Sequence, residues 1–155
     1  MFNAGIASLH AAVAVAIVAA PSIIMAQTPG PDAIVGTWQA EDNSAMFEIF
    51  NAGGTYAARV IRNNRLVEAD GQTFRRDEKN PDPALRSRSL KGIVFLKDLQ
   101  WDAADQRWEG GSVYDPVSGR TASARLSLDG AKLSMRAYMG TPMLGRTVHF
   151  RRVAR

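Results

Sequence analysis

The chain has 155 residues, with 19 Lys or Arg, 15 Asp or Glu, no cysteine and a formal net charge of +4. This length supports one domain with a substantial core. The absence of cysteine excludes disulfides, cysteine nucleophiles and thiolate metal sites. The excess positive charge lies entirely between Arg59 and Lys91. Such a segment is typical of a surface for anionic partners, or of an ordinary solvated face.

Residues 1–26 contain no Lys, Arg, Asp or Glu and are almost wholly apolar after residue 8, which predicts an export signal peptide. We expect cleavage after Ala26, because Ile24-Met25-Ala26 ends in the small residue that cleavage requires. The alternative is an uncleaved anchor, although about 18 apolar residues interrupted by His10 and Pro21 are marginal for a membrane span. Without disulfides, the exported protein is predicted to be periplasmic rather than extracellular. Residues 27–33 are expected to form a disordered leader.

From residue 34 to residue 153 the chain is predicted to be one domain of short strands joined mostly by tight turns. Alternation of apolar and polar residues is clearest from Arg120 to Leu128, and Asp129-Gly130 then signals a two-residue hairpin. Asn63-Asn64 is a second predicted hairpin turn, followed by a short return over residues 65–68. The other predicted strands cover residues 34–39, 46–51, 55–62, 92–97, the run that begins at Trp108, 132–138 and 146–153, with a polar connection over residues 101–105.

Residues 69–91 interrupt this pattern with charges and prolines and are predicted to form one long loop, a kind of segment that is often functional. In Asn80-Pro81-Asp82-Pro83, both Asn80 and Asp82 precede a proline and are held away from helical conformations. Asp82 can still cap a short helical turn that begins at Pro83. Arg86 and Arg88 in this loop can pair bidentately with a ligand phosphate or carboxylate. Alternatively, they pair with Asp77, Asp82 or Asp115 and hold the loop down.

About eight antiparallel strands with one apolar face predict an all-β fold, either an up-and-down barrel or a two-sheet sandwich. We favour the barrel, because consecutive hairpins dominate and closure removes exposed edges. The expected inward residues of the later strands are small: Gly111, Ala122, Ala124 and Ala137. Such residues either leave a ligand cavity or let the barrel flatten until its walls touch.

The hairpin from Trp108 to Gly119 carries the aromatic candidates for binding. Gly110 and Gly111 mark a bend or a close approach of backbone, and Asp115-Pro116-Val117-Ser118-Gly119 is a tight-turn signal. Strand alternation predicts that Trp108 and Tyr114, six residues apart, share a face. With Tyr138 they are candidates for gripping a flat or acyl group. Alternatively, they fill the space that the glycines leave.

Two groups of residues resemble known families. Gly36-Thr37-Trp38 near the start, with Arg146, Arg151 and Arg152 near the end, is similar to the lipocalin-like signature in which a first-strand Trp packs against a final-strand cation. A larger set resembles the exported bacterial family called domain of unknown function 2147, over about residues 34–153. It comprises Asp77, Asn80-Pro81-Asp82-Pro83, Arg86, Leu90, Gly92, Trp108, Gly110-Gly111, Tyr114-Asp115-Pro116, Ser118-Gly119, Leu133, Tyr138 and Gly140.

That resemblance implies an exported, lipocalin-like β-barrel and supplies no established activity. It implies structural roles for Gly36, Trp38, Asn80, Pro81, Asp82, Pro83, Gly110, Gly111, Asp115, Pro116 and Gly119. Three positions depart from the family pattern: Ala122 replaces an aromatic, Ser89 a proline and Phe150 a tryptophan. Each departure removes bulk or stiffness.

No catalytic constellation is predicted. His149 is the only histidine after the leader, and no nucleophile elbow surrounds any serine. The carboxylates of Asp77, Glu78, Asp82 and Asp115 have arginines close in sequence or lie in turns, and their spacing does not match a calcium loop. We therefore predict no enzyme, metal or cofactor. Export and the lack of aromatics among the basic residues argue against nucleic acid.

Two functional hypotheses remain for this domain, which we expect to be monomeric. The first is a non-enzymatic periplasmic binding protein for a small apolar or amphiphilic ligand inside the barrel. The second is a structural or interaction module of the cell envelope, with a filled barrel and a basic surface that contacts protein or anionic lipid head groups.

Overall fold

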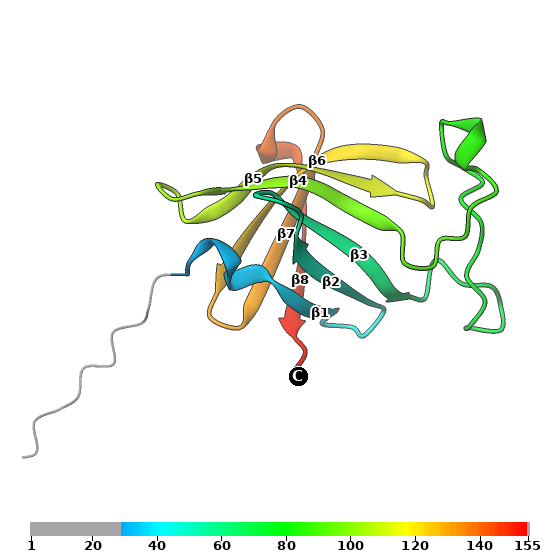
Figure 1. Ribbon diagram of the computed structural model, residues 1–155, viewed down its shortest axis with the longest axis horizontal. Coiled ribbons are helices and arrows are strands. Elements are labelled where there is room, and N and C mark those ends of the chain that lie inside the picture. Colours follow the sequence, from blue (N-terminus) through cyan, green and yellow to red (C-terminus); the bar gives the residue numbers. More distant parts are fainter. Residues whose placement is uncertain (1–28, 155) are drawn as a thin grey trace, which may run out of the picture.

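Eight antiparallel strands pair in chain order, and the last pairs with the first, so the sheet closes into a barrel (Figure 1). The computed structural model describes residues 29–154. The elements are the 3-10 helix η1 (Pro31–Ile34), β1 (Gly36–Ala40), β2 (Ala45–Asn51), β3 (Tyr56–Asn63), the 3-10 helix η2 (Pro83–Leu85), β4 (Val94–Asp102), β5 (Arg107–Asp115), β6 (Arg120–Asp129), β7 (Lys132–Tyr138), the 3-10 helix η3 (Pro142–Leu144) and β8 (Arg146–Arg152). The predicted up-and-down barrel is confirmed, and the sandwich is excluded.

Alternation along the later strands decides which residues enter the core. On β6, Ala124 and Leu126 are fully buried, and they pair across the sheet with Ala137 and Met135 of β7. Intervening residues such as Ser123 and Ser127 are exposed. This period of two fixes the register, because a slip by one residue would expose the apolar set.

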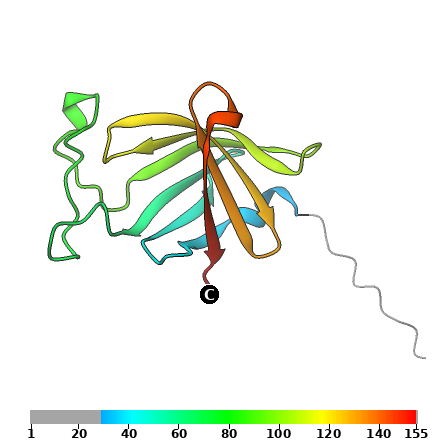
Figure 2. The same ribbon diagram turned by 180° about the vertical axis from the view of Figure 1, so that it is seen from behind.

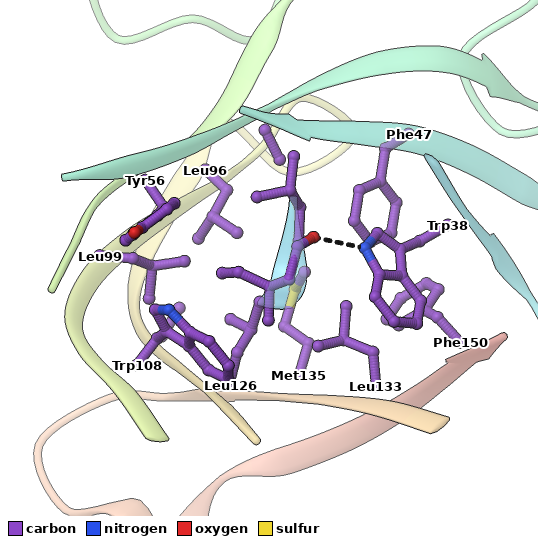
Figure 3. Packing of buried hydrophobic residues seen from close by; sticks show 14 of the residues in the cluster. Trp38, Phe47, Tyr56, Leu96, Leu99, Trp108, Leu126, Leu133, Met135 and Phe150 are labelled. Carbon is purple, nitrogen blue, oxygen red and sulfur yellow. Dashed lines mark hydrogen bonds between the residues drawn. The ribbon is translucent and has the colours of Figure 1, made fainter. Parts of the chain in front are cut away.

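One end of the barrel is closed by η1. The indole N–H of Trp38 donates to the Ile34 carbonyl at 2.8 Å (Figure 3), and that of Trp108 donates to the Pro31 carbonyl at 2.9 Å. The Tyr56 hydroxyl donates to the Asp32 carboxylate at 2.7 Å. We expected residues 27–33 to be disordered. For residues 31–33 that expectation is wrong, because the barrel satisfies their polar groups and buries the adjoining Ile34 completely.

A cation from the last strand seals the same end. The Arg152 guanidinium lies 4.3 Å from the Trp38 ring centroid, and it donates to the Val35 carbonyl at 2.9 Å and also to the Ala33 carbonyl. Of the three arginines considered from the sequence, Arg152 is the one that packs on Trp38. The lipocalin-like arrangement of a first-strand Trp and a final-strand cation is therefore present.

The long loop projects from the opposite end of the barrel, as the front and rear views both show (Figures 1 and 2). No strand forms over residues 65–68, so the return strand predicted there is wrong; Val67 instead makes an isolated bridge with Phe74 inside the loop. The loop adds no strand to the barrel, because β3 pairs directly with β4. The helical turn expected at Pro83 is confirmed as η2, and the Asp82 carboxylate accepts from Ala84 N–H at 2.9 Å.

Several strand boundaries differ from the prediction: the first strand begins at Gly36, because Ile34 belongs to η1, and one later strand differs at both ends. The strand expected over residues 92–97 is β4, which runs from Val94 to Asp102 and takes up part of the predicted polar connection. One face of β4 is turned to solvent, since Val94 is 38% exposed whereas Leu96 is fully buried. A continuous apolar run thus conceals a strand with one face toward solvent.

The described part of the chain holds no helix long and apolar enough to cross a membrane. The signal peptide predicted over residues 1–26, with its cleavage point, lies outside the described residues.

Candidate ligand-binding cavity

The barrel is filled at the η1 end and hollow at the end that carries the long loop. Its core packs around Trp38, Trp108, Leu99 and Leu126 (Figure 3). The hollow measures about 720 Å³, within the range of about 300–1,000 Å³ typical of small-ligand sites. Its apolar wall comprises Ala40, Phe47, Val60, Phe95, Val113, Ala122, Met135, Ala137, Val148 and Phe150.

Three phenylalanines form part of this wall. The Phe47 ring meets the rings of Phe95 and Phe150 edge to face, with centroids 5.5 Å and 4.8 Å apart. Phe47 and Phe150 also belong to the closed core. The aromatic cluster therefore marks the boundary between the filled half of the barrel and the open half.

Small side chains leave the volume above this boundary. Ala122 of β6 lies opposite Val113 of β5, and all three residues Val113, Ala122 and Ala137 line the hollow. Val148 is in register with the core residue Met135, yet it is 45% exposed. An inward-facing valine with that exposure shows that the hollow opens to solvent. The sequence left open whether the barrel holds a cavity or flattens until its walls touch. The structure has a cavity in one half of the barrel.

The mouth carries more positive than negative charge. Its charged lining residues are Arg62, Arg65, Arg120, Arg146, Asp42 and Asp115. The four arginines were not among the predicted site residues. The sequence could have indicated two of them, because strand alternation continues from the inward residues to these arginines. On β6 the inward series Ala124 and Ala122 leads to Arg120, and on β8 the series Phe150 and Val148 leads to Arg146.

Beside the mouth, the long loop is fastened to the barrel by a buried carboxylate. Asp77 is fully buried and accepts from the Tyr114 hydroxyl at 2.6 Å, from Asn80 Nδ2 at 2.7 Å and from Arg88 Nη2 at 2.7 Å. Burial alone would raise the pKa of Asp77, but the hydrogen bonds from Tyr114, Asn80 and Arg88 outweigh it and lower that pKa. Burial, with the bond to Asp77, raises the pKa of Tyr114 to about 12.

The arginines predicted to meet a ligand serve this loop instead. Arg88 makes an ion pair with Asp77, and the Arg86 guanidinium donates to the Asn80 carbonyl at 2.8 Å. The alternative prediction, that arginines here hold the loop down, describes both residues, although Arg86 bonds a backbone carbonyl and not a carboxylate. Neither residue lines the cavity.

Trp108 and Tyr114 do not share a face, contrary to the prediction. A β-bulge lies between Trp108 and Gly111, where three steps on β5 match two on β6, and Gly110 takes φ +70° there. The extra residue reverses the alternation, so Trp108 enters the closed core while Tyr114 reaches out to Asp77. Tyr114 still lines the cavity at its rim; Trp108 does not.

Tyr138 also falls outside the cavity. It pairs with Ser123 on β6, and the inward residue of its strand is the adjoining Ala137. The strand alternation on β7 therefore places Tyr138 on the outer face. Of the three aromatic candidates, Tyr114 alone lies at the mouth.

The residues expected to have structural roles organise the turn and the loop. The Asp115 carboxylate accepts from Val117 N–H at 3.1 Å and from the Ser118 hydroxyl at 2.8 Å, which closes the turn that contains Pro116. At Gly119, a Cβ would lie 2.0 Å from the Lys79 carbonyl oxygen, so only glycine lets the loop backbone approach so closely. Asn80, next to Lys79, also accepts from Asp82 N–H at 2.9 Å within the Asn80-Pro81-Asp82-Pro83 run. Gly36 begins β1, and Gly111 packs against Leu99 inside the barrel.

A second hollow, of about 670 Å³, lies on the outer face of β6, β7 and β8. It is lined by Arg107, Arg125, Arg136 and Met143, among others. Arg136 spans the base of η3, donating to the carbonyls of Pro142 and Met143 at 2.6 Å and 3.1 Å. This arginine is therefore committed to holding the η3 loop, and the interior cavity is the better ligand site.

Side chains of the types that bind metal ions lie apart from one another in the described part of the chain. Between residues 29 and 154, no group of three or more His, Asp or Glu side chains is arranged to hold a metal ion. His149 bonds with the Ser134 hydroxyl at 2.9 Å. The candidate site is an apolar hollow with a charged mouth.

Comparisons with known proteins agree with this architecture. A family model described as "Uncharacterized protein conserved in bacteria (DUF2147)" matches residues 36–152. Among solved structures, the chain is similar to one titled "Protein HP1028 from the human pathogen Helicobacter pylori belongs to the lipocalin family", with 27% identity and a TM-score of 0.65. That likeness covers 78% of this chain and 83% of the other. No curated protein matches the chain.

Proposed function

The chain belongs to the DUF2147 family of uncharacterised bacterial proteins, and we propose that it is a non-enzymatic binding protein that holds a small apolar or amphiphilic ligand in the open half of its barrel. The observation that carries the proposal is the solvent-open hollow of about 720 Å³, whose inner wall is apolar and whose mouth is charged. Transfer of an apolar group from water to such a wall is favourable, at about 25 cal/mol for each Å² buried.

Export to the periplasm is part of the same proposal. The uncharged, apolar segment over residues 1–26 and the absence of cysteine support it. A carrier or sensor in that compartment would meet lipids and other amphiphiles of the envelope.

Two departures from the resembled family pattern support a ligand over a filled barrel. Ala122 and Phe150, which stand where an aromatic and a tryptophan are usual, both line the hollow. Each is smaller than the residue it replaces. The volume they free lies where a ligand would sit.

The test is binding of the apolar dye N-phenylnaphthylamine, whose fluorescence rises when it leaves water. We expect delipidated protein to bind the dye, and Ala122→Trp to weaken binding by about tenfold or more, because the indole would fill the hollow. Ser123→Trp, on the exposed outer face of the same strand, is the matched control and should bind like the unaltered protein. Equal dye affinity in the Ala122→Trp protein would refute the proposed site.

A second candidate, an envelope interaction module, is favoured by a different observation. Three apolar residues between β7 and β8 are strongly exposed: Met139 at 67%, Met143 at 87% and Leu144 at 81%. Met139 lines the cavity mouth with Arg146, and Met143 lines the outer hollow with Arg107 and Arg125, so exposed apolar side chains lie close to basic ones, which fits an anionic bilayer surface. In this function the basic mouth would contact lipid head groups and not enclose a ligand.

A further inference from the structure

Two arginines at the cavity mouth belong to the inward-facing series of their strands. On β6, Arg120 lies two residues before the inward residue Ala122, so it points to the same side of the strand. On β8, Arg146 lies opposite the inward residue Ala137 of β7. Both arginines line the hollow. Both side chains are exposed at the rim of the hollow, so they can reach an anionic group on a molecule that enters from the mouth.

The fold itself makes no use of either guanidinium. Among residues 29–154, the side chains of Arg120 and Arg146 have no hydrogen-bonding or ionic partner. Asp115 is the cross-strand neighbour of Arg120, but its carboxylate is engaged by Val117 and Ser118 of its own turn. Arg62 at the same mouth differs, since it donates to the Asn43 carbonyl at 3.0 Å.

The wider mouth reinforces the positive potential at these positions. Of the two lining carboxylates, that of Asp42 accepts from Ser44 N–H at 2.9 Å, and that of Asp115 closes its turn. Four arginines line the mouth against these two acids. The guanidinium groups of Arg65, Arg120 and Arg146 are left unengaged at this mouth by the described part of the chain, and the apolar wall formed by Ala122, Ala137 and Val148 begins next to the last two.

We propose that the cavity takes a single-chain amphiphile with an anionic head group, carboxylate or phosphate, which Arg120 and Arg146 bind while the chain lies against the apolar wall. This inference rests on the function proposed above and specifies its ligand class. Guanidinium groups suit both heads because they can donate two parallel hydrogen bonds to carboxylate or phosphate.

Displacement of N-phenylnaphthylamine by laurate, dodecyl phosphate and dodecanol tests the assignment, because the three share a chain and differ in the head. Laurate or dodecyl phosphate should displace the dye at concentrations about tenfold below those of dodecanol, the effect of a charge-assisted hydrogen bond. Comparison of the two anions separates a carboxylate head from a phosphate head. Inorganic phosphate and acetate should displace nothing, since they lack the chain.

The variants Arg120→Gln and Arg146→Gln should each bring the affinity for the preferred anion toward that for dodecanol, while the affinity for dodecanol changes little. Arg125→Gln is the matched control, because Arg125 lies on the same strand as Arg120 but lines the outer hollow. Equal displacement by laurate, dodecyl phosphate and dodecanol would overturn the head-group assignment and leave the cavity function standing. Displacement by inorganic phosphate alone would also overturn it. If the unaltered protein does not bind the dye, the proposed function fails as well.

Discussion

Asp77 shows how far the role of a single residue can be predicted: its pairing with Arg88 was one of two predicted alternatives, whereas its complete burial and its bonds with Tyr114 and Asn80 were not predicted. The family resemblance included it, yet its sequence neighbourhood, with Arg75, Arg76 and Lys79, is that of a solvated loop. In the structure it is a fully buried carboxylate with hydrogen bonds from three side chains. A buried charge is tolerated only with such compensation, so the network fixes the loop to β5 through Tyr114.

The change Asp77→Asn should lower the free energy of unfolding at neutral pH by about 2–3 kcal/mol, because it removes hydrogen bonds to a charged acceptor. The folded-state pKa of Asp77 lies below its ordinary value of 3.8. Its stabilising effect is therefore complete above that value and is lost as pH falls through the folded pKa. Urea unfolding at a series of pH values should show the difference between the two proteins shrinking on acidification.

Glu78→Gln is the control for Asp77→Asn, because it removes the same charge at the adjacent, exposed position. It should change stability by less than about 0.5 kcal/mol. A difference between Asp77→Asn and the unaltered protein that stays constant from about pH 6 to about pH 2 would contradict the assigned role.

The aromatic residues show where alternation in the sequence misleads. The prediction that Trp108 and Tyr114 share a face assumed an unbroken period of two, and the bulge at Gly110 adds one residue between them. The two adjoining glycines indicated a bend in the strand. They did not indicate that an extra residue lies there, because a bulge depends on how the strand pairs with its neighbour. Arg120 and Arg146 could have been predicted, since no bulge separates them from the inward residues Ala122 and Val148 of their strands.

At the scale of elements, the strands, the tight turns and the presence of the long loop were largely predictable, and the contacts that hold the loop were not. Strand alternation and Asp129-Gly130 depend on local chemistry, which a sequence displays directly. The loop over residues 64–93 is held by distant contacts: Tyr114 bonds to Asp77, and the Lys79 carbonyl lies against Gly119. The short helix η1 was missed for the same reason, because residues far along the chain supply its hydrogen-bonding partners.

Helix η1 provides a prediction about the closed end. Ile34 is fully buried, and its carbonyl accepts the Trp38 indole N–H. Ile34→Ala should reduce the free energy of unfolding by about 2–5 kcal/mol, the usual cost of such a truncation in a packed core. Leu144→Ala, at a side chain that is 81% exposed, should change it by less than about 0.5 kcal/mol in the same urea titration. A small effect of Ile34→Ala would show that η1 does not seal the barrel.

For the whole molecule, the two ends of the barrel divide its tasks. The η1 end holds both buried tryptophans and most of the core, and can supply stability without any ligand. The opposite end has the cavity, the arginines and the exposed η3 loop. Stability and binding are thereby separated along one barrel, which lets the mouth carry apolar and charged groups that would be unfavourable in a core.

This asymmetry predicts how the molecule would sit on a membrane if the interaction module is its function. Vesicles rich in phosphatidylglycerol should then sediment with the protein, and vesicles of phosphatidylcholine should not, since each basic residue near an anionic surface contributes about 1 kcal/mol. The double change Met143→Ser plus Leu144→Ser should reduce sedimentation by removing the exposed apolar contacts while leaving the cavity lining intact, so dye binding should persist. The double change Ile61→Ser plus Val94→Ser, at exposed residues of β3 and β4 outside the cavity lining, is the control and should sediment normally. Sedimentation that is indifferent to lipid charge and to the η3 loop would exclude this surface and leave ligand binding as the function of the open end.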